Sequence, residues 1–296
     1  MEQLDTRFKS AEFAAAGIKA SHSRIGALLR EAGVLKFEDV ERIARLQQEE
    51  ASLFGEIAAR LYGLSQDDIE QALERQFGQN RLRNGQSDVS LEVLAAYSPR
   101  TDQLAPLRKL RSNLLADQHV TNRHLTYAIT SAKRGDGRST LCANLAVLFA
   151  QLGRRTLLID ADLHHPRQHR LFGLSNRTGL SSSLAGRATD ELLQIVPGLN
   201  SLSVITAGAT PPNPNELLGR PLLQVILTRL SQQYEVILLD TPANTETGDT
   251  QAVAMSARNA LVLVRKDASS SATTKQLVSE LAAARVHVLG CVMNEF

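Results

Sequence analysis

Six short runs of almost uninterrupted apolar residues recur along the second half of the chain, and amphipathic stretches of helical periodicity separate most of them. The runs lie near residues 125–131, 155–160, 202–206, 235–240, 260–265 and 286–293. A strand that is apolar at successive positions has to be covered on both faces, as happens in a parallel sheet flanked by helices. We therefore predict a doubly wound α/β fold that binds its ligands at the carboxyl ends of the strands.

The first part of the chain has a different pattern. From Ser23 to Phe77 the sequence is helical in periodicity and repeats itself at an offset of 29 residues. We predict a small all-helical domain over residues 21–80, preceded by an alanine-rich lead-in at residues 1–20. The polar, glycine- and proline-marked stretch 81–103 is expected to be a linker, which leaves residues 104–296 for the α/β domain.

Composition narrows the class of protein. The chain of 296 residues is 43% hydrophobic with a net charge of +2, which indicates neither a nucleic-acid partner nor an acidic one. No apolar segment is long enough to span a bilayer, and the acid-containing N-terminus lacks the apolar run of a secretory signal. Cys142 and Cys291 fall in a predicted helix and a predicted strand, without metal-ligand spacing. We expect a cytoplasmic protein with reduced, buried thiols.

One strand-to-helix connection, residues 129–140, is glycine-rich and basic. Gly135 and Gly137 allow backbone angles in which successive N–H groups face one anion, and the helix that follows adds its positive end. The Ser139 hydroxyl can bind Mg²⁺. Compared with the phosphate-binding pattern G-x-x-x-x-G-K-[ST], Ala132 replaces the first glycine and Arg138 replaces the lysine. Taken alone, this segment fits a phosphate-binding turn and a ligand-free basic turn equally well.

Carboxylates at two strand ends favour the phosphate-binding interpretation. Asp160 and Asp162 follow one apolar run, and Asp240 follows another. The carboxyl ends of parallel strands lie at one edge of the sheet, and Mg²⁺ prefers oxygen ligands. A single acid would more simply cap the next helix. Two acidic strand ends together with a phosphate turn predict a nucleotide–Mg²⁺ site.

In combination, these segments resemble the bacterial tyrosine kinases of polysaccharide export, and among them the EpsG-type chain-length determinant kinases. The resemblance covers Leu104 to Phe296. The matching segments are Gly135–Ser139 (Walker A), Asp160–Asp162 (Walker A′), Asp240–Pro242 (Walker B), Pro211–Pro214 and Val292–Asn294.

The resemblance implies a P-loop NTPase fold, ATP and Mg²⁺ as cofactors, and protein-tyrosine kinase activity. Asp160 would accept the proton of the tyrosine hydroxyl, and Arg138 would stabilise charge on the transferred phosphoryl group. Magnesium would be held by Ser139, Asp162 and Asp240. The nucleotide would be bound by Lys133, Gly135, Asp136, Gly137, Arg138, Ser139, Thr140 and Asn294.

The resemblance also implies partners. The protein would regulate exopolysaccharide chain length and export together with a membrane co-polymerase, the chain-length determinant, which would bring it to the inner membrane. Arg108 and Arg111 would belong to the family's E-x-x-R-x-x-R motif and form contacts between subunits of a homo-oligomer. Ala105 stands where that motif has glutamate, and His164 stands where D-x-D-x-R has arginine.

Two alternatives remain open on the sequence. The chain ends at Phe296 without the family's C-terminal tyrosine cluster, so the usual phosphate acceptor is not expected. One alternative is a Min/Par-like ATPase without kinase activity, which Lys133 supports because related ATPases keep a second lysine there. The other is a non-catalytic nucleotide-binding regulatory subunit.

The N-terminal repeat resembles the N-terminal domain of type II secretion and pilus ATPases, some of which bind cyclic di-GMP through paired R-L-G-x-x-L-x-x-x-G-like motifs. The first copy, with Arg24 and Gly26, fits that motif. The second has Leu53 where arginine is expected and Tyr62 where glycine is expected. We therefore favour a protein-docking module over a site for cyclic di-GMP.

Overall fold

The computed structural model describes residues 26–27, 29–30, 33–50, 52–64, 81–98, 101–121, 125–187, 192–244 and 248–295. Its contacts divide the chain into two units, Met1–Asn80 and Arg81–Phe296, and each is described by itself. Within the described ranges, no helix combines the length and the apolar character needed to cross a membrane.

The first unit is helical, as predicted. Its described helices are α2 (Phe37–Glu50) and α3 (Phe54–Tyr62), and α3 ends at Gly63 in the left-handed conformation. A small core contains Leu29, Leu35, Ile43, Phe54, Ile57 and Ala58. Arg24 and the stretch 65–80, which holds about half of the second repeat, lie outside the described residues.

Gly26 has a packing role in this unit. A Cβ atom at this position would lie 2.5 Å from Val40 Cγ1 and 3.2 Å from Phe54 Cζ. Any larger residue would push these side chains away. Close helix packing is therefore sufficient reason for a glycine here, without a ligand.

The second unit is built on a seven-stranded sheet in the order β3-β4-β2-β5-β1-β6-β7. Its strands are β1 (Leu125–Ser131), β2 (Thr156–Asp160), β3 (Gln194–Ile195), β4 (Leu202–Ile205), β5 (Val236–Asp240), β6 (Asn259–Arg265) and β7 (His287–Asn294). All neighbours pair in parallel except β3, which is antiparallel to β4. The six predicted apolar runs are the six parallel strands, and the predicted fold class is confirmed.

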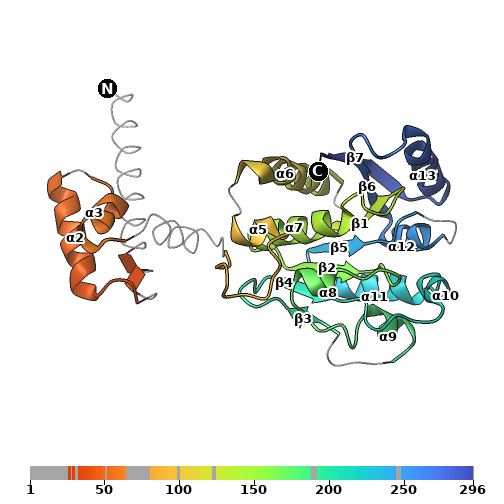
Figure 1. The fold of residues 1–296 in the computed structure, drawn as a ribbon, viewed down its shortest axis with the longest axis horizontal. Helices are drawn as coiled ribbons and strands as arrows, with labels where there is room; N and C mark the ends of the chain where they lie inside the picture. The colour runs from red at the N-terminus through yellow and green to blue at the C-terminus, as the bar shows by residue number, and fades with distance from the viewer. Residues whose placement is uncertain are drawn as a thin grey trace, which may run out of the picture. The chain divides into compact units, whose positions relative to one another are not determined.

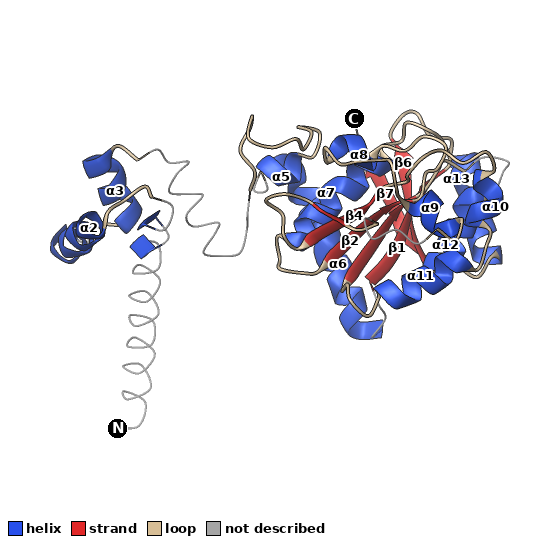
Figure 2. Ribbon diagram, turned by 90° about the horizontal axis from the view of Figure 1, so that it is seen from below, coloured by secondary structure: helices blue, strands red, loops and turns tan. Residues whose placement is uncertain are grey.

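Helices cover both faces of the sheet (Figures 1 and 2). One face carries α5 (Leu94–Tyr97), α6 (Ala105–Thr121) and α7 (Arg138–Ala150), with the 3₁₀ turn η1 (Asp102–Leu104) before α6. The other carries α9 (Leu180–Leu184), α10 (Pro214–Leu218), α11 (Leu222–Leu230), α12 (Asp249–Ala257) and α13 (Ser271–Ala283). Side chains alternate between the two cores. In β5, Val236 and Leu238 face α7, whereas Ile237 and Leu239 face the opposite layer.

The segment 81–98, which we call the strap, was expected to be part of a linker, but it packs on the α/β unit. Val89, Val93 and Tyr97 are buried in the core around α7. Two amide side chains, one in α7 and one directly after it, bind the strap's backbone: Asn144 Oδ1 accepts from Ala95 N (2.8 Å), and Gln151 Nε2 donates to Ala95 O (2.8 Å). The polar side chains of this segment are typical of a linker. The hydrogen bonds that fix its backbone come from residues about fifty positions away, so the local sequence does not indicate them.

Candidate nucleotide site

The predicted phosphate turn connects β1 to α7, with its glycines in left-handed conformations. Gly135 has φ of 88° and Gly137 has φ of 100°. The backbone conformation favours glycine at 137, and a Cβ atom there would also lie 2.4 Å from Asn294 Nδ2 and displace that side chain. Gly137 immediately precedes Arg138, the first residue of α7. The turn is therefore placed at the positive end of a buried thirteen-residue helix.

Asp136 organises this turn. Its carboxylate accepts hydrogen bonds from Lys133 N (3.2 Å) and from Ser269 Oγ (3.0 Å). Its carbonyl accepts one from Asn294 Nδ2 (2.9 Å), which links the end of β7 to the turn. Asp136 and Asn294 are both predicted to bind nucleotide. In the structure their hydrogen bonds hold the turn in place.

Arg138 lies under the turn. Nε donates to Thr241 O (2.9 Å), and Nη1 donates to Lys133 O (2.8 Å) and to Ser131 Oγ. The residue is only 7% exposed. Its guanidinium thus bridges the ends of β1 and β5. The Lys133 side chain is exposed, and Thr140 accepts a bond from Asn144 through its carbonyl.

Asp160 and Asp240 are paired in register at the ends of neighbouring strands β2 and β5, and both are fully buried. Asp160 accepts backbone hydrogen bonds from Asp162 (3.2 Å), Arg167 (2.9 Å) and Gln168 (2.9 Å). Burial, with the nearby charge of Asp240, raises the pKa of Asp160 well above its usual range. These bonds close the loop after β2 around the carboxylate.

Asp240 is bonded on one side only. Its Oδ2 accepts from Gln168 Nε2 at 2.8 Å, whereas Oδ1 is buried without a hydrogen-bond partner. Burial raises the pKa of Asp240 to about 6, against the hydrogen bond from Gln168, which lowers it. The Ser139 hydroxyl is close enough to lower this pKa as well.

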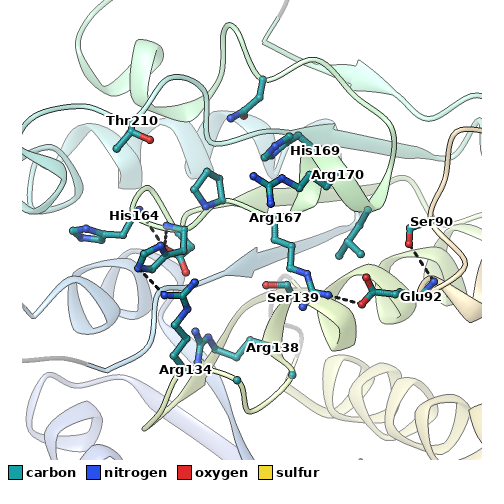
Figure 3. Close-up of a pocket in the computed structure, with 17 residues that line it drawn as sticks. Ser90, Glu92, Arg134, Arg138, Ser139, His164, Arg167, His169, Arg170 and Thr210 are labelled. Atoms are coloured by element: carbon teal, nitrogen blue, oxygen red, sulfur yellow. Dashed lines mark hydrogen bonds and ion pairs between the residues drawn. The ribbon is translucent and has the colours of Figure 1, made fainter.

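A hollow of about 890 Å³ opens in front of the turn (Figure 3). Figure 3 shows Arg134, Arg138 and Ser139 on one side and Thr210, His169 and Arg170 opposite. Of the predicted site residues, the hollow is lined by Gly135, Gly137, Arg138, Ser139 and Asp162. Asp160 and Asp240 are buried and do not line it.

Sequence reasoning missed most of the opposite wall, which belongs to the loop after β2 and to the strap. Five of the seven residues from His164 to Arg170 are basic or imidazole-bearing, and all five line the hollow. This density of arginine and histidine residues was the available signal. Ser90 and Glu92 come from the strap, and Glu92 forms an ion pair with Arg167.

His164 ties the loop after β2 to α12. Its Nε2 lies 2.6 Å from Asp249 Oδ2, and its ring points away from Ser139 (Figure 3). The Asn215 amide, with its nitrogen towards Asp249, donates to both carboxylate oxygens at 3.0 and 2.7 Å. Asp162 Oδ1 accepts from the backbone N–H groups of His164 and His165 at 3.2 and 2.8 Å.

The arrangement fits a magnesium nucleotide. The unpartnered buried Oδ1 of Asp240 and the neighbouring Ser139 hydroxyl are oxygen atoms of the kind that Mg²⁺ binds, and the turn lies at the positive end of α7. Among the described residues, no cluster of three or more His, Cys, Asp or Glu side chains could hold a metal ion. Mg²⁺ is commonly bound by one or two carboxylates together with phosphates and water, so such a cluster is not required.

The two arginines predicted to contact another subunit make bonds within their own chain. Arg108 Nη1 donates to Thr101 O (3.0 Å), and Arg111 Nη1 donates to Leu148 O (2.9 Å) at the end of α7. Both residues are partly buried on α6. Their role in an oligomer stays a prediction.

Three comparisons place these features among known proteins. The ParA family model, described as the NUBPL iron-transfer P-loop NTPase, matches residues 122–295. The tyrosine-protein kinase YwqD of Bacillus subtilis is 32% identical over 212 residues, covering 72% of this chain and 89% of YwqD. The structure of the kinase domain of the Escherichia coli tyrosine kinase Etk has a TM-score of 0.65 and 30% identity, over 68% of this chain and 79% of that chain. The cell-division ATPase MinD of Pyrococcus furiosus has a TM-score of 0.52 and 26% identity, over 59% of this chain and 73% of that chain.

Proposed function

The chain belongs to the P-loop tyrosine-protein kinases of bacterial polysaccharide export, and on that premise we propose that it transfers the γ-phosphoryl group of ATP to tyrosine hydroxyls to regulate exopolysaccharide chain length. The observation that carries the proposal is the meeting of the phosphate turn with the register-paired acids Asp160 and Asp240. Of the functions considered, the kinase relatives support this one over a Min/Par-like ATPase.

The site residues divide the work as follows. Backbone N–H groups of the turn and of the start of α7 would bind the phosphates, and Ser139, Asp162 and Asp240 would hold Mg²⁺ directly or through water. Bound Mg²⁺ would neutralise charge on the transferred group. Arg138 keeps the turn in shape from beneath. Arg167 and Arg170, from the loop after β2, line the hollow opposite the turn and would add positive charge near the phosphates.

The acceptor hydroxyl enters through the hollow. Tyr97 and Tyr127 are buried, at 8% and 2% exposure, and Tyr97 donates its hydroxyl hydrogen to Val89 O. Tyr62 and Tyr234 are half-buried. We infer that the acceptor is supplied by a different protein, the membrane chain-length determinant. The helical unit would dock such a partner.

The test uses the full chain with ATP, Mg²⁺ and a glutamate–tyrosine copolymer, followed by a phosphotyrosine blot and by calorimetry with ADP. Asp240→Ala should abolish both transfer and Mg²⁺-dependent ADP binding. The control Asp102→Ala changes an exposed acid outside the hollow and should behave as wild type. Equal ADP affinity in Asp240→Ala and wild type would refute the assignment of Asp240 to the nucleotide site. Hydrolysis of ATP without formation of phosphotyrosine would refute the proposed kinase activity.

A further inference from the structure

Gln168 contacts three segments of the nucleotide site: the end of β2, the end of β5 and the start of α7. It is the first residue of α8 (Gln168–Leu171) and has no exposed surface. Its backbone N donates to Asp160 Oδ2, and its side-chain Nε2 donates to Asp240 Oδ2 (2.8 Å) and to Ser139 O (3.1 Å). One buried side chain therefore joins the loop after β2 to the end of β5 and the start of α7.

Gln168 and Asp240 each have one acceptor atom that receives no hydrogen bond from the part of the chain that the structure describes. Gln168 Oε1 and Asp240 Oδ1 are both buried, and neither has a hydrogen-bond partner among the described residues. The orientation of the amide is settled, because its nitrogen faces two oxygen acceptors. An unpaired buried acceptor costs about 1–3 kcal/mol, so two in one contact pair point to donors supplied by a ligand.

We propose that Gln168 is a positioning residue of the magnesium site: Nε2 holds Asp240 by Oδ2 so that Oδ1 faces the ion, and Oε1 accepts from the ion's hydration shell. This inference rests on the proposed function. Mg²⁺ suits such a site, since it keeps several of its waters in proteins and these need acceptors. Removing the amide would leave the Asp240 carboxylate free to turn and would remove one acceptor for the shell.

A purely structural role for Gln168 predicts something different. In that case, its loss would lower stability but would not alter the dependence of nucleotide binding on Mg²⁺. The chain offers a matched control in Gln151, a second buried glutamine whose Nε2 donates to a backbone carbonyl, Ala95 O. Gln151 touches neither acid, so Gln151→Met reports the cost of losing a buried amide alone.

The experiment measures ADP affinity of the full chain by calorimetry, once with Mg²⁺ and once with EDTA. Wild type should bind ADP more tightly with Mg²⁺. Gln168→Met should lower affinity at least tenfold with Mg²⁺ but less than twofold in EDTA, whereas Gln151→Met should keep the wild-type ratio. An unchanged ratio in Gln168→Met would overturn the inference.

Two further arms keep the test decisive. If Gln168→Met does not fold, Gln168→Asn keeps an amide but is one methylene too short to reach Asp240, and the same loss of the Mg²⁺ effect is expected. A wild-type ratio in Gln168→Asn would then overturn the inference. If wild type itself shows no Mg²⁺ effect, the proposed nucleotide–magnesium function fails. If wild type shows the effect and the Gln168 variant keeps it, only the role of Gln168 fails.

Discussion

Replacing Arg138 by lysine should weaken the phosphate turn. The guanidinium makes three hydrogen bonds in two directions, to Thr241 O beyond β5 and to Lys133 O and Ser131 Oγ near the end of β1. An ammonium on a shorter stem is compact and cannot span both strand ends at once. We therefore expect Arg138→Lys to keep one of these contacts and to lose two.

The size of the effect follows from those contacts. Hydrogen bonds from a charged donor contribute about 1.5–3 kcal/mol each, so losing two should lower the free energy of unfolding by about 3 kcal/mol or more. For a unit of this size, 1 kcal/mol corresponds to roughly 2–4 °C in Tm. A fall in Tm of about 6–12 °C is therefore expected at the lower bound, together with weaker ADP binding.

Thermal unfolding followed by circular dichroism checks the stability, and calorimetry checks the binding. Arg134→Lys is the control, because Arg134 is exposed in the same turn and its Nη1 lies 3.2 Å from His165 Nε2. Its variant should change stability by less than about 1 kcal/mol. The reasoning fails if Arg138→Lys is as stable as wild type and transfers phosphate about tenfold faster, a gain of about 1.4 kcal/mol. That result would mean that the guanidinium acts on the phosphates and serves them poorly.

Two further predictions concern the buried acids and the strap. Because burial raises the pKa of Asp240 from 3.8 to about 6, the folded state holds this proton more tightly than the unfolded state. The stability that this proton contributes is fully present below the unfolded-state pKa of 3.8 and is lost as pH rises through about 6, a fall of about 3 kcal/mol in the free energy of unfolding. Denaturant unfolding across that range should show a flatter profile for Asp240→Asn, and equal slopes would contradict the assignment. Asn144→Leu removes bonds to Ala95 N, Glu92 O and Thr140 O. It should speed hydrogen exchange within residues 81–98 by at least tenfold, and unchanged protection would contradict the strap's attachment.

The sheet was predictable from sequence because its strands carry their own signal. Strands β1, β2, β4 and β5 are buried at every position, so each is a continuous apolar run. The edge strand β7 has only half-buried and exposed positions. The limits of all six parallel strands can be located from the sequence within a residue or two. The exception is β3, two residues long, which pairs only with β4. Nothing in Gln194 or Ile195 indicates a strand, because the pairing depends on where β4 has been placed by the fold.

The candidate site likewise contains residues with a local sequence signal and residues that are placed by contacts between distant segments. The phosphate turn and the acids at the ends of β2 and β5 have local spacing, and the fold brings them to one edge of the sheet. Gln168 and the strap depend on contacts between distant segments. Arg138 is a third case. The sequence shows an arginine at this position of the turn, but it does not show which groups the side chain contacts. A long side chain with five donors can point to phosphate or to the carbonyls beneath the turn, and only the surroundings decide.

The geometry around Asp160 joins proton transfer to the magnesium site. As a base, Asp160 needs an oxygen that can reach the tyrosine hydroxyl, yet both of its oxygens accept backbone N–H groups and it does not line the hollow. Freeing Oδ2 requires the loop to release the N–H groups of Arg167 and Gln168. That movement also draws the Gln168 side chain from Asp240. In this position of the loop Gln168 holds Asp240 and Asp160 has no oxygen free for a tyrosine hydroxyl, so the role of Asp160 as the base stays a prediction.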